Sequence, residues 1–330
     1  MRHLQWGLIG AGRIAGKFAD GLATLEGATA LAIGSRSLEK AQRFAHDHQV
    51  ERACGSYEEV LDEPDVDAVY IALPNAMHAE WSIRAAEAGK HILCEKPAAV
   101  NAPQLQRVLD VVRRRDVFFM EAFMYRCHPQ WGKLLELLDQ GAIGEVRLLH
   151  SAFAFKMGMD LENIRMRNEL AGGGLMDVGC YCVSFCRLVA GEEPIECKAV
   201  AHIGEEGRVD YQMTGVLKFP SGICAYFTSA IQCSVPTSAV VYGSEGHIEV
   251  ASPWFPNDQT ARLIVRAGGE PVTHSITTGR ELYANEALTV ARYLDQRQAP
   301  RPCMSWEDSL GQGRTLDALR QSMGLRFDGE

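Results

Sequence analysis

The sequence predicts an α/β protein in two parts: a parallel sheet covered by helices, then an α+β region with a large, mostly antiparallel sheet. In the first third, short apolar strands alternate with amphipathic helical stretches, which indicates a parallel sheet covered on both faces. From residue 195 onward, longer strands are joined by short turns, which is typical of hairpins. We expect domains at 1–122 and 123–330, with a C-terminal helix that packs back on the first.

The N-terminal elements are predicted from their periodicity. Near-continuous apolar runs indicate buried strands, and apolar residues spaced three and four apart indicate helices. The expected strands are 5–10, 29–35, 67–73, 91–95 and 117–121, and the expected helices are 13–25, 38–48, 77–89 and 102–115.

The C-terminal part begins with helical patterns at 128–141 and 172–191. Turns at 220–222 and 243–246 then separate apolar runs and predict two hairpins. Helical patterns at 285–297 and 305–323 end the chain, and Ser305 with Asp308 fits a capping box for the second.

Composition narrows the class of partner. A net charge of -9 argues against nucleic acid and anionic membranes, and no apolar run approaches the roughly 18 residues of a membrane span. We therefore expect a small-molecule partner. The N-terminal residues lack the apolar core of a secretory signal, and the ten cysteines are scattered, so we expect reduced thiols and the cytoplasm. Cys180, Cys182 and Cys186 fit small core residues better than ligands, and we expect no metal.

A glycine fingerprint follows the first strand. Gly10, Gly12 and Ala15 form G-x-G-x-x-A at the opening of a helix, a pattern that brings a dinucleotide pyrophosphate to backbone N–H groups. We expect a Rossmann domain in which Gly10, Gly12, Arg13 and Ile14 contact the cofactor.

The end of the second strand favours NADP, with NAD as the alternative. NAD sites usually carry a carboxylate there, about 20 residues past the fingerprint. This chain has Ser35, Arg36 and, a few residues later, Lys40, which suit a 2'-phosphate.

Two further segments carry candidate chemistry. Lys96 directly follows the 91–95 strand, at the carboxyl edge where ligands bind in open parallel sheets, although a lysine there can also be a plain surface residue. Asp177 and Tyr181 lie four apart on one helix face after three glycines. Each also has a structural interpretation, as a helix-dipole carboxylate and a half-buried aromatic.

These segments resemble the Gfo/Idh/MocA family of NAD(P)-dependent oxidoreductases. The resemblance covers the whole chain and rests on the fingerprint together with LPNAMH, AGKHILCEKP, ELAGGGLMDVGCY and GEEPIE, at 73–78, 88–97, 169–181 and 191–196. Within the family, the chain is similar to glucose-fructose oxidoreductase and to the dimeric dihydrodiol and D-xylose dehydrogenases.

The resemblance implies a cis bond between Lys96 and Pro97 and a reaction centre of Lys96, Asp177 and Tyr181. It implies that Tyr125 and Arg126 lie where the domains meet. The cofactor contacts it implies are Leu73, Pro74, Asn75, His78, Glu95, Lys96 and Arg126.

The residue chemistry fits alcohol oxidation, which needs a base for the hydroxyl proton. A lysine ammonium about 4 Å from a tyrosine supplies on the order of 4 kcal/mol at an effective dielectric near 20, or about 3 pKa units. We therefore assign general acid/base catalysis to Tyr181 and the electrostatic role to Lys96, and the reverse assignment stays open. Asp177 would orient the substrate hydroxyl or the pair.

The stretch EAFMYRCHP, 121–129, favours a sugar or polyol, such as an aldose oxidised at the anomeric carbon, because its YRCH matches glucose-fructose oxidoreductase. Tyr125, His128 and Arg165 are the candidate substrate residues, and His128 could equally cap the following helix. Three alternatives remain: a trans-dihydrodiol dehydrogenase, a non-catalytic NAD(P) or sugar sensor, and an NAD-dependent glycosidase. We expect a homodimer or higher homo-oligomer. The sequence does not name the sugar or the physiological direction.

Overall fold

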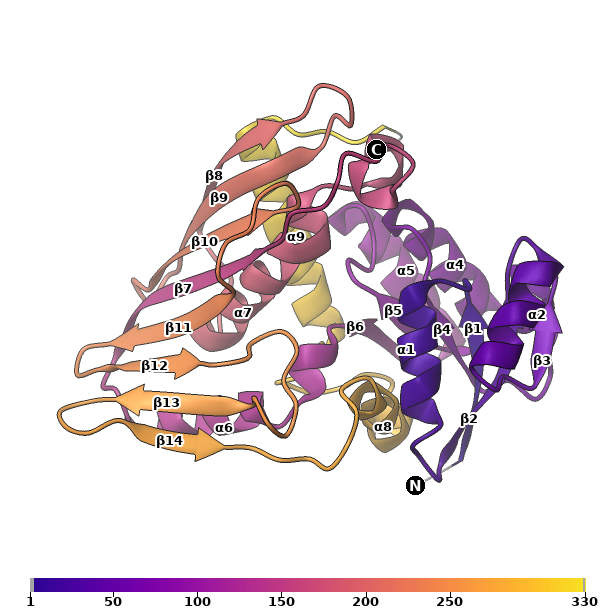
Figure 1. The fold of residues 1–330 in the computed structure, drawn as a ribbon, viewed down its shortest axis with the longest axis horizontal. Coiled ribbons are helices and arrows are strands. Elements are labelled where there is room, and N and C mark those ends of the chain that lie inside the picture. Colours follow the sequence, from indigo (N-terminus) through magenta and orange to yellow (C-terminus); the bar gives the residue numbers. More distant parts are fainter. Residues whose placement is uncertain (1–2, 329) are drawn as a thin grey trace. The chain divides into compact units, whose positions relative to one another are not determined.

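The computed structural model describes residues 3–328 and 330, and the chain divides into two compact units. The first unit is Met1–Cys127 with Arg280–Leu310, and the second is His128–Gly279 with Gly311–Glu330 (Figure 1). Residues 280–310 therefore belong with the N-terminal third of the chain rather than with the segment that immediately precedes them.

The first unit contains a six-stranded sheet in which every pair of neighbours is parallel, as predicted. Its strand order is β3-β2-β1-β4-β5-β6, with β1 (Leu4–Ile9), β2 (Ala28–Gly34), β3 (Arg52–Cys54), β4 (Ala68–Ile71), β5 (His91–Glu95) and β6 (Phe119–Ala122). The order reverses between β1 and β4, so the loops that follow these two strands share the carboxyl edge where ligands bind in such sheets. β3 was not predicted, because three residues beginning with an exposed Arg52 give no apolar run.

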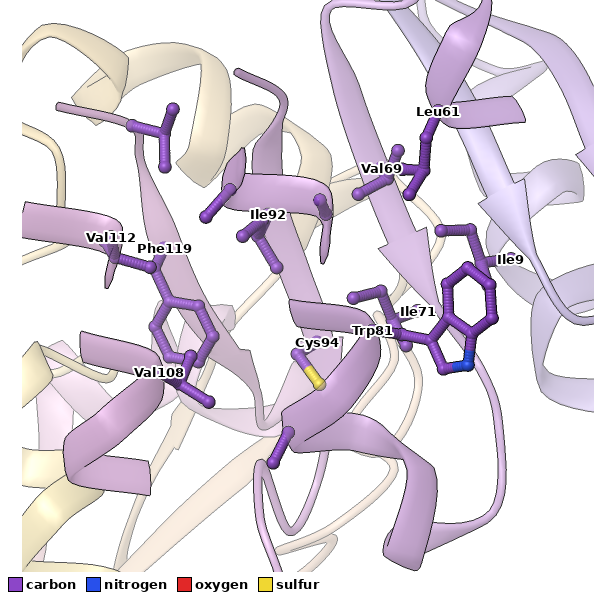
Figure 2. Close-up of a cluster of buried hydrophobic side chains, with 14 of the residues drawn as sticks. Ile9, Leu61, Val69, Ile71, Trp81, Ile92, Cys94, Val108, Val112 and Phe119 are labelled. Atoms are coloured by element: carbon purple, nitrogen blue, oxygen red, sulfur yellow. The ribbon is translucent and has the colours of Figure 1, made fainter. Parts of the chain in front are cut away.

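Helices cover both faces of this sheet. They are α1 (Arg13–Leu22), α2 (Leu38–Asp47), α3 (Tyr57–Asp62), α4 (Asn75–Glu87), α5 (Ala102–Arg115) and α8 (Ala284–Tyr293), with short 3₁₀ turns at Met124–Cys127 and Leu294–Gln296. On one face, side chains of β1, β4 and β5 pack against Trp81 of α4 and Val108 of α5 (Figure 2). On the other face, Phe18 of α1 packs against Trp6 and stacks on Tyr70 with ring centroids 4.1 Å apart.

The second unit contains an eight-stranded sheet in the order β14-β13-β12-β11-β7-β10-β9-β8 (Figure 1). Its strands are β7 (Val146–Ala154), β8 (Glu196–Ile203), β9 (Asp210–Lys218), β10 (Cys224–Ala230), β11 (Ser238–Gly243), β12 (His247–Val250), β13 (Arg262–Arg266) and β14 (Val272–Ser275). Only β7 and β10 pair in parallel, so the prediction of a mostly antiparallel sheet is confirmed. Both predicted hairpins are present, as β9 with β10 and β11 with β12.

The remaining helices are α6 (Gln130–Asp139), α7 (Cys180–Ala190) and α9 (Trp306–Met323), with 3₁₀ turns at Ile164–Met166 and Asn168–Leu170 and a π-helical turn at Leu175–Gly179. The predicted cap of α9 is present, since Ser305 Oγ accepts from the Asp308 N–H at 3.1 Å. The stretch Asn168–Ala190 is long and apolar enough to cross a membrane, and an 18-residue window within it has a mean hydropathy of 1.3. Because 89% of this window is buried inside the protein, the stretch fits a core helix.

Candidate active site

The glycine fingerprint forms the turn between β1 and α1. Gly10 has a φ of +104°, and a Cβ there would lie 2.6 Å from the carbonyl oxygen of Ala72, so this position requires glycine. Gly12 is the N-cap of α1, without a side-chain cap, and a Cβ on it would meet nothing within 4 Å. The open backbone at a helix N-terminus fits the pyrophosphate of a dinucleotide.

The residues that follow β2 fit an additional phosphate. Arg36 and Lys40 are exposed, and the buried Ser35 accepts a hydrogen bond from the Ser37 N–H at 3.4 Å through its Oγ. Ser37 in turn caps α2 by accepting from the Lys40 N–H. The strand therefore ends in a capped turn that presents two cations.

His78 ties the loop after β4 to the turn after β5. Its Nδ1 lies 2.7 Å from the carbonyl oxygen of Pro97, and its Nε2 lies 2.8 Å from that of Leu73. The ring is buried, and burial lowers the pKa of His78 below its ordinary value, against the raising effect of these two carbonyls. His78 thus joins the two loops, and its predicted contact with the cofactor stays a prediction, as do those of Leu73, Pro74 and Asn75.

The turn that presents Lys96 is held by buried carboxyl groups. The Lys96–Pro97 bond is cis, as the resemblance implies. Glu95 accepts from the hydroxyl of Tyr70 and, through Oε2, from the Lys96 N–H at 3.2 Å, while Glu121 accepts from the Ala98 N–H at 3.0 Å. Glu95 and Glu121 are both buried.

Glu286 of α8 is a further buried carboxyl group whose ionisation is opposed by the charge of Glu95. It is fully buried, and among the described residues neither of its carboxyl oxygens has a hydrogen-bond partner. Burial first, and then the charge of Glu95, raise the pKa of Glu286 well above its ordinary value. Sequence reasoning missed Tyr70 and Glu286, because each lies in a pattern that also fits an ordinary strand or helix.

Asp177 and Tyr181 come from one helical segment of the second unit. Asp177 lies in the π-helical turn, and Tyr181 lies in the first turn of α7, which continues it. Asp177 Oδ2 accepts from Arg165 Nε at 2.6 Å, so the structure brings Arg165 to Asp177. Tyr181 is only 5% exposed, and its ring packs edge-on against Phe153 and Trp254.

Tyr125, Arg126 and His128 are buried. Arg126 donates to Asp308 Oδ2 at 2.5 Å and to the carbonyl oxygen of Pro302, so its guanidinium takes part in the first unit's own structure. His128 Nδ1 accepts from the Gln130 N–H at 3.2 Å. Because α6 begins at Gln130, this hydrogen bond fits the second prediction for His128, that it caps the following helix. Burial lowers the pKa of His128 to about 4. Contacts of these three residues with cofactor or substrate stay predictions.

The structure therefore groups the candidates by unit. The first unit holds the fingerprint, the cations after β2 and Lys96, and the second holds Asp177, Tyr181, Arg165 and His128. Cys180, Cys182 and Cys186 are buried, as expected of core residues. Within the described part of the chain, no group of three or more His, Cys, Asp or Glu side chains is placed to hold a metal ion.

Comparison with known proteins gives matches along most of the chain. Residues 4–123 match the oxidoreductase family with an NAD-binding Rossmann fold, and residues 131–249 match the GFO/IDH/MocA C-terminal domain. A trans-1,2-dihydrobenzene-1,2-diol dehydrogenase of Xenopus tropicalis is 34% identical over 98% of this chain and 99% of its own length. A D-xylose 1-dehydrogenase (NADP(+)) of Haloferax volcanii is 37% identical over 89% of each chain.

Solved structures agree with these matches. KijD10, a 3-ketoreductase from Actinomadura kijaniata in complex with NADP and TDP-benzene, superposes with a TM-score of 0.89 at 29% identity, covering 97% of this chain and 98% of its own. An aldose-aldose oxidoreductase from Caulobacter crescentus, complexed with glycerol, gives a TM-score of 0.87 at 26% identity, with 97% of each chain covered.

Proposed function

The chain belongs to the Gfo/Idh/MocA family of oxidoreductases, and we propose that it is an NADP-dependent dehydrogenase acting on a sugar or polyol, most simply an aldose such as D-xylose or D-glucose at C1. One observation carries the proposal. Asp177, which forms an ion pair with Arg165 of a separate 3₁₀ turn, lies on the same helical segment as Tyr181, so hydrogen-bonding groups and an acid/base side chain are within about one turn of each other. A polar substrate with several hydroxyl groups suits such a set.

The chain's own residues divide the work of alcohol oxidation. When bound, the nicotinamide supplies the acceptor for the hydride. The ammonium of Lys96 stabilises the phenolate form of Tyr181, and this phenolate takes the hydroxyl proton and becomes the neutral phenol. The aromatic side chains around Tyr181 exclude water, which strengthens the effect of a nearby cation. Asp177, held by Arg165, accepts a hydrogen bond from a substrate hydroxyl and orients it.

NADP rather than NAD is supported by two exposed cations that suit the 2'-phosphate, Arg36 just after β2 and Lys40 in the first turn of α2. The relative from Haloferax volcanii carries NADP in its name, and the KijD10 structure contains NADP, which supports the same choice. NAD remains the alternative cofactor.

Turnover of a substrate panel tests the proposal. Aldoses, cyclic polyols and aromatic trans-diols are assayed with NADP and with NAD, and the absorbance of the reduced nicotinamide is followed. Steady NADPH formation with one or more sugars is expected. Tight NADP binding without turnover across the panel would contradict the proposal and favour a sensor, and glycoside cleavage without net NADPH would favour the glycosidase.

A second candidate, trans-dihydrodiol dehydrogenase, is favoured by the aromatic residues beside Tyr181. The ring of Phe255 is half exposed and lies 5.9 Å from that of Phe153, which itself packs against Tyr181. Such a surface can stack on the ring of an aromatic diol. Turnover of aromatic trans-diols with a higher kcat/KM than any sugar in the same panel would establish this alternative.

We expect the protein to work in the cytoplasm as a homodimer. All ten cysteines are free thiols, which suits a reducing compartment. The eight-stranded sheet exposes Val200, Val216 and Tyr226, and Val216 and Tyr226 are neighbours on paired strands of this face. An exposed apolar row on a sheet suits pairing with a second copy. Sedimentation or light scattering that gives a monomer at micromolar concentration would contradict the dimer.

A further inference from the structure

Asp210, the first residue of β9, is a fully buried carboxylate beside the glycine turn that precedes Asp177 and Tyr181. Its Oδ2 accepts from the Leu175 N–H at 2.7 Å, and the Gly174 N–H also stabilises the carboxylate. Among the described residues its Oδ1 has no hydrogen-bond partner, and it faces Gly173. The buried carboxylate therefore accepts hydrogen bonds from the backbone N–H groups at the start of the π-helical turn.

Asp210 and the backbone of the Arg165 loop together restrict the run of three glycines. A Cβ on Gly173, which has a φ of +101°, would lie 2.2 Å from Asp210 Oδ1, and one on Gly174 would lie 3.2 Å from Oδ2. On Gly172, a Cβ would lie 2.5 Å from the carbonyl oxygen of Arg165. The turn is thus enclosed between the Asp210 carboxylate and the backbone of the Arg165 loop, with no room for a Cβ at Gly172 or Gly173 and only a tight fit at Gly174.

Hydrogen bonds connect this turn to the proposed reaction groups. The Gly173 N–H donates to the carbonyl oxygen of Arg165 at 2.8 Å, and the Asp177 N–H donates to the carbonyl oxygen of Gly173 at 3.0 Å. The side chain of Arg165 then holds Asp177 Oδ2. Gly173 therefore fixes both partners of the Asp177–Arg165 pair through its backbone.

We infer that Asp210 is a positioning residue of the reaction: it fixes the glycine turn and, through it, the Asp177–Arg165 pair and the start of the helix that carries Tyr181. This inference rests on the proposed function. Burial raises the pKa of Asp210 to about 7, against the lowering effect of the N–H groups it accepts from. Asp210 is therefore an acidic residue at a position where burial opposes its ionisation. Its oxygen atoms give a reason for an acid at this position, because they accept hydrogen bonds from the glycine turn.

Three substitutions and one matched control test this role. Asp210→Ala removes the acceptors, Asp210→Asn keeps one of them in nearly the same shape, and Asp210→Ser places its hydroxyl one bond too short to reach Leu175. The control is Ser229→Ala on β10. Ser229 is equally buried and lies against Gly179 of the same helical segment, but its Oγ has no hydrogen-bond partner among the described residues.

Hydrogen exchange followed by mass spectrometry reads the turn directly and needs no substrate. In Asp210→Ala, peptides covering 172–182 are expected to exchange at least about 10-fold faster than in wild type, while peptides from β11 and β12 are unchanged. Asp210→Asn should restore most of the protection, and Ser229→Ala should match wild type. If Asp210→Ala does not fold, Asp210→Ser is the deciding variant. Wild-type exchange over 172–182 in the deciding variant would overturn the inference.

Kinetics on the substrate found for the wild type completes the test. At a temperature well below the unfolding midpoint, Asp210→Ala is expected to lose about 100-fold in kcat with an unchanged Kd for NADP, because the reacting groups are displaced while the fingerprint is intact. Asp177→Asn combined with Asp210→Ala should lose less than the product of the two single effects. A fully multiplicative loss, or a kcat like that of Ser229→Ala, would overturn the inference. If wild type turns over nothing in the panel, the proposed function fails while the exchange result still decides the role of Asp210 in the turn.

Discussion

At the scale of single residues, the positive side chain of Arg36 is exposed directly after β2, where a dinucleotide's adenosine ribose is expected. Arg36 is exposed at the end of β2, and the adjacent Ser35 is buried and fixed by its turn. A guanidinium on a fixed turn suits a phosphate, whereas NAD sites usually carry a carboxylate there.

Replacing Arg36 with Ala is therefore expected to discriminate between the two cofactors. Loss of a charge-assisted hydrogen bond of about 1.5–3 kcal/mol should raise the Kd for NADP roughly 10- to 100-fold and leave the Kd for NAD nearly unchanged. Titration of nucleotide fluorescence measures both constants. An equal weakening of NADP and NAD would show that Arg36 does not contact the 2'-phosphate.

His128 makes a separate prediction about pH. Its pKa is about 4 in the folded protein because burial disfavours the imidazolium, whereas an unfolded histidine titrates near 6.5. The unfolded state therefore binds the proton first, and stability is lost as pH falls from about 6.5 toward 4. The difference corresponds to about 3 kcal/mol.

Urea unfolding at pH 8, 6 and 4.5 measures this effect. His128→Asn keeps an acceptor for the Gln130 N–H but does not titrate, so the free energy of unfolding of wild type should fall more steeply below pH 6.5 than that of the variant. Parallel pH dependences would contradict a buried neutral imidazole.

At the scale of elements, the fingerprint turn contains two glycines that are required for different reasons. Gly10 lacks room for a Cβ within the protein, whereas Gly12 has open space around it. Gly10→Ala should therefore destabilise the fold itself, and Gly12→Ala should spare the fold but obstruct the pyrophosphate.

Thermal unfolding and NADP titration distinguish these effects. Gly10→Ala is expected to lower the free energy of unfolding by about 2 kcal/mol or more. Gly12→Ala is expected to keep the wild-type midpoint and raise the Kd for NADP at least about 10-fold. Gly132→Ala in α6, where a Cβ also meets nothing within 4 Å, is the control: it should leave the Kd for NADP unchanged and raise the midpoint slightly, because alanine favours a helix more than glycine does. Wild-type NADP affinity in Gly12→Ala would contradict the assigned pyrophosphate site.

Most elements could be predicted from the sequence, and the exceptions have physical causes. Long apolar strands and hairpin turns produce a local pattern, so both sheets were predicted. The three-residue β3 produces none, and the π-helical turn at Leu175–Gly179 has the same apolar spacing as an α-helix. Lys96 and Tyr181 could be named as candidates because their motifs are local, and their roles stay predictions. The contacts of Asp210 with Leu175 and of Glu95 with Tyr70 join distant segments that sequence periodicity does not connect.

At the scale of the whole molecule, cofactor binding should be visible as stability. A ligand that binds only the folded state adds about 2.7 kcal/mol when present at 100 times its Kd. NADP should therefore raise the thermal midpoint in a concentration-dependent manner, and Gly12→Ala should need at least about 10-fold more NADP for the same shift. Differential scanning fluorimetry measures this. A midpoint that does not respond to NADP or NAD would contradict cofactor binding.

The division into two units also determines which part of the chain must be used in a catalytic assay. The fingerprint and Lys96 belong to the first unit, and Asp177 and Tyr181 belong to the second, so the proposed mechanism uses residues of both units. The full-length chain is the appropriate material, because residues 280–310 complete the first unit from a distant part of the sequence.

The assignment of Tyr181 as the acid/base group is tested most directly by measuring NADPH formation by wild type and by Tyr181→Phe. Both are assayed at saturating NADP with the best sugar of the panel. Tyr181→Phe keeps the ring that packs against Phe153 and Trp254 and removes only the hydroxyl. We predict steady turnover by wild type and a loss of about 100-fold or more in kcat in the variant, with the Kd for NADP unchanged. Near-wild-type turnover by Tyr181→Phe would contradict the assignment of Tyr181 as the acid/base group.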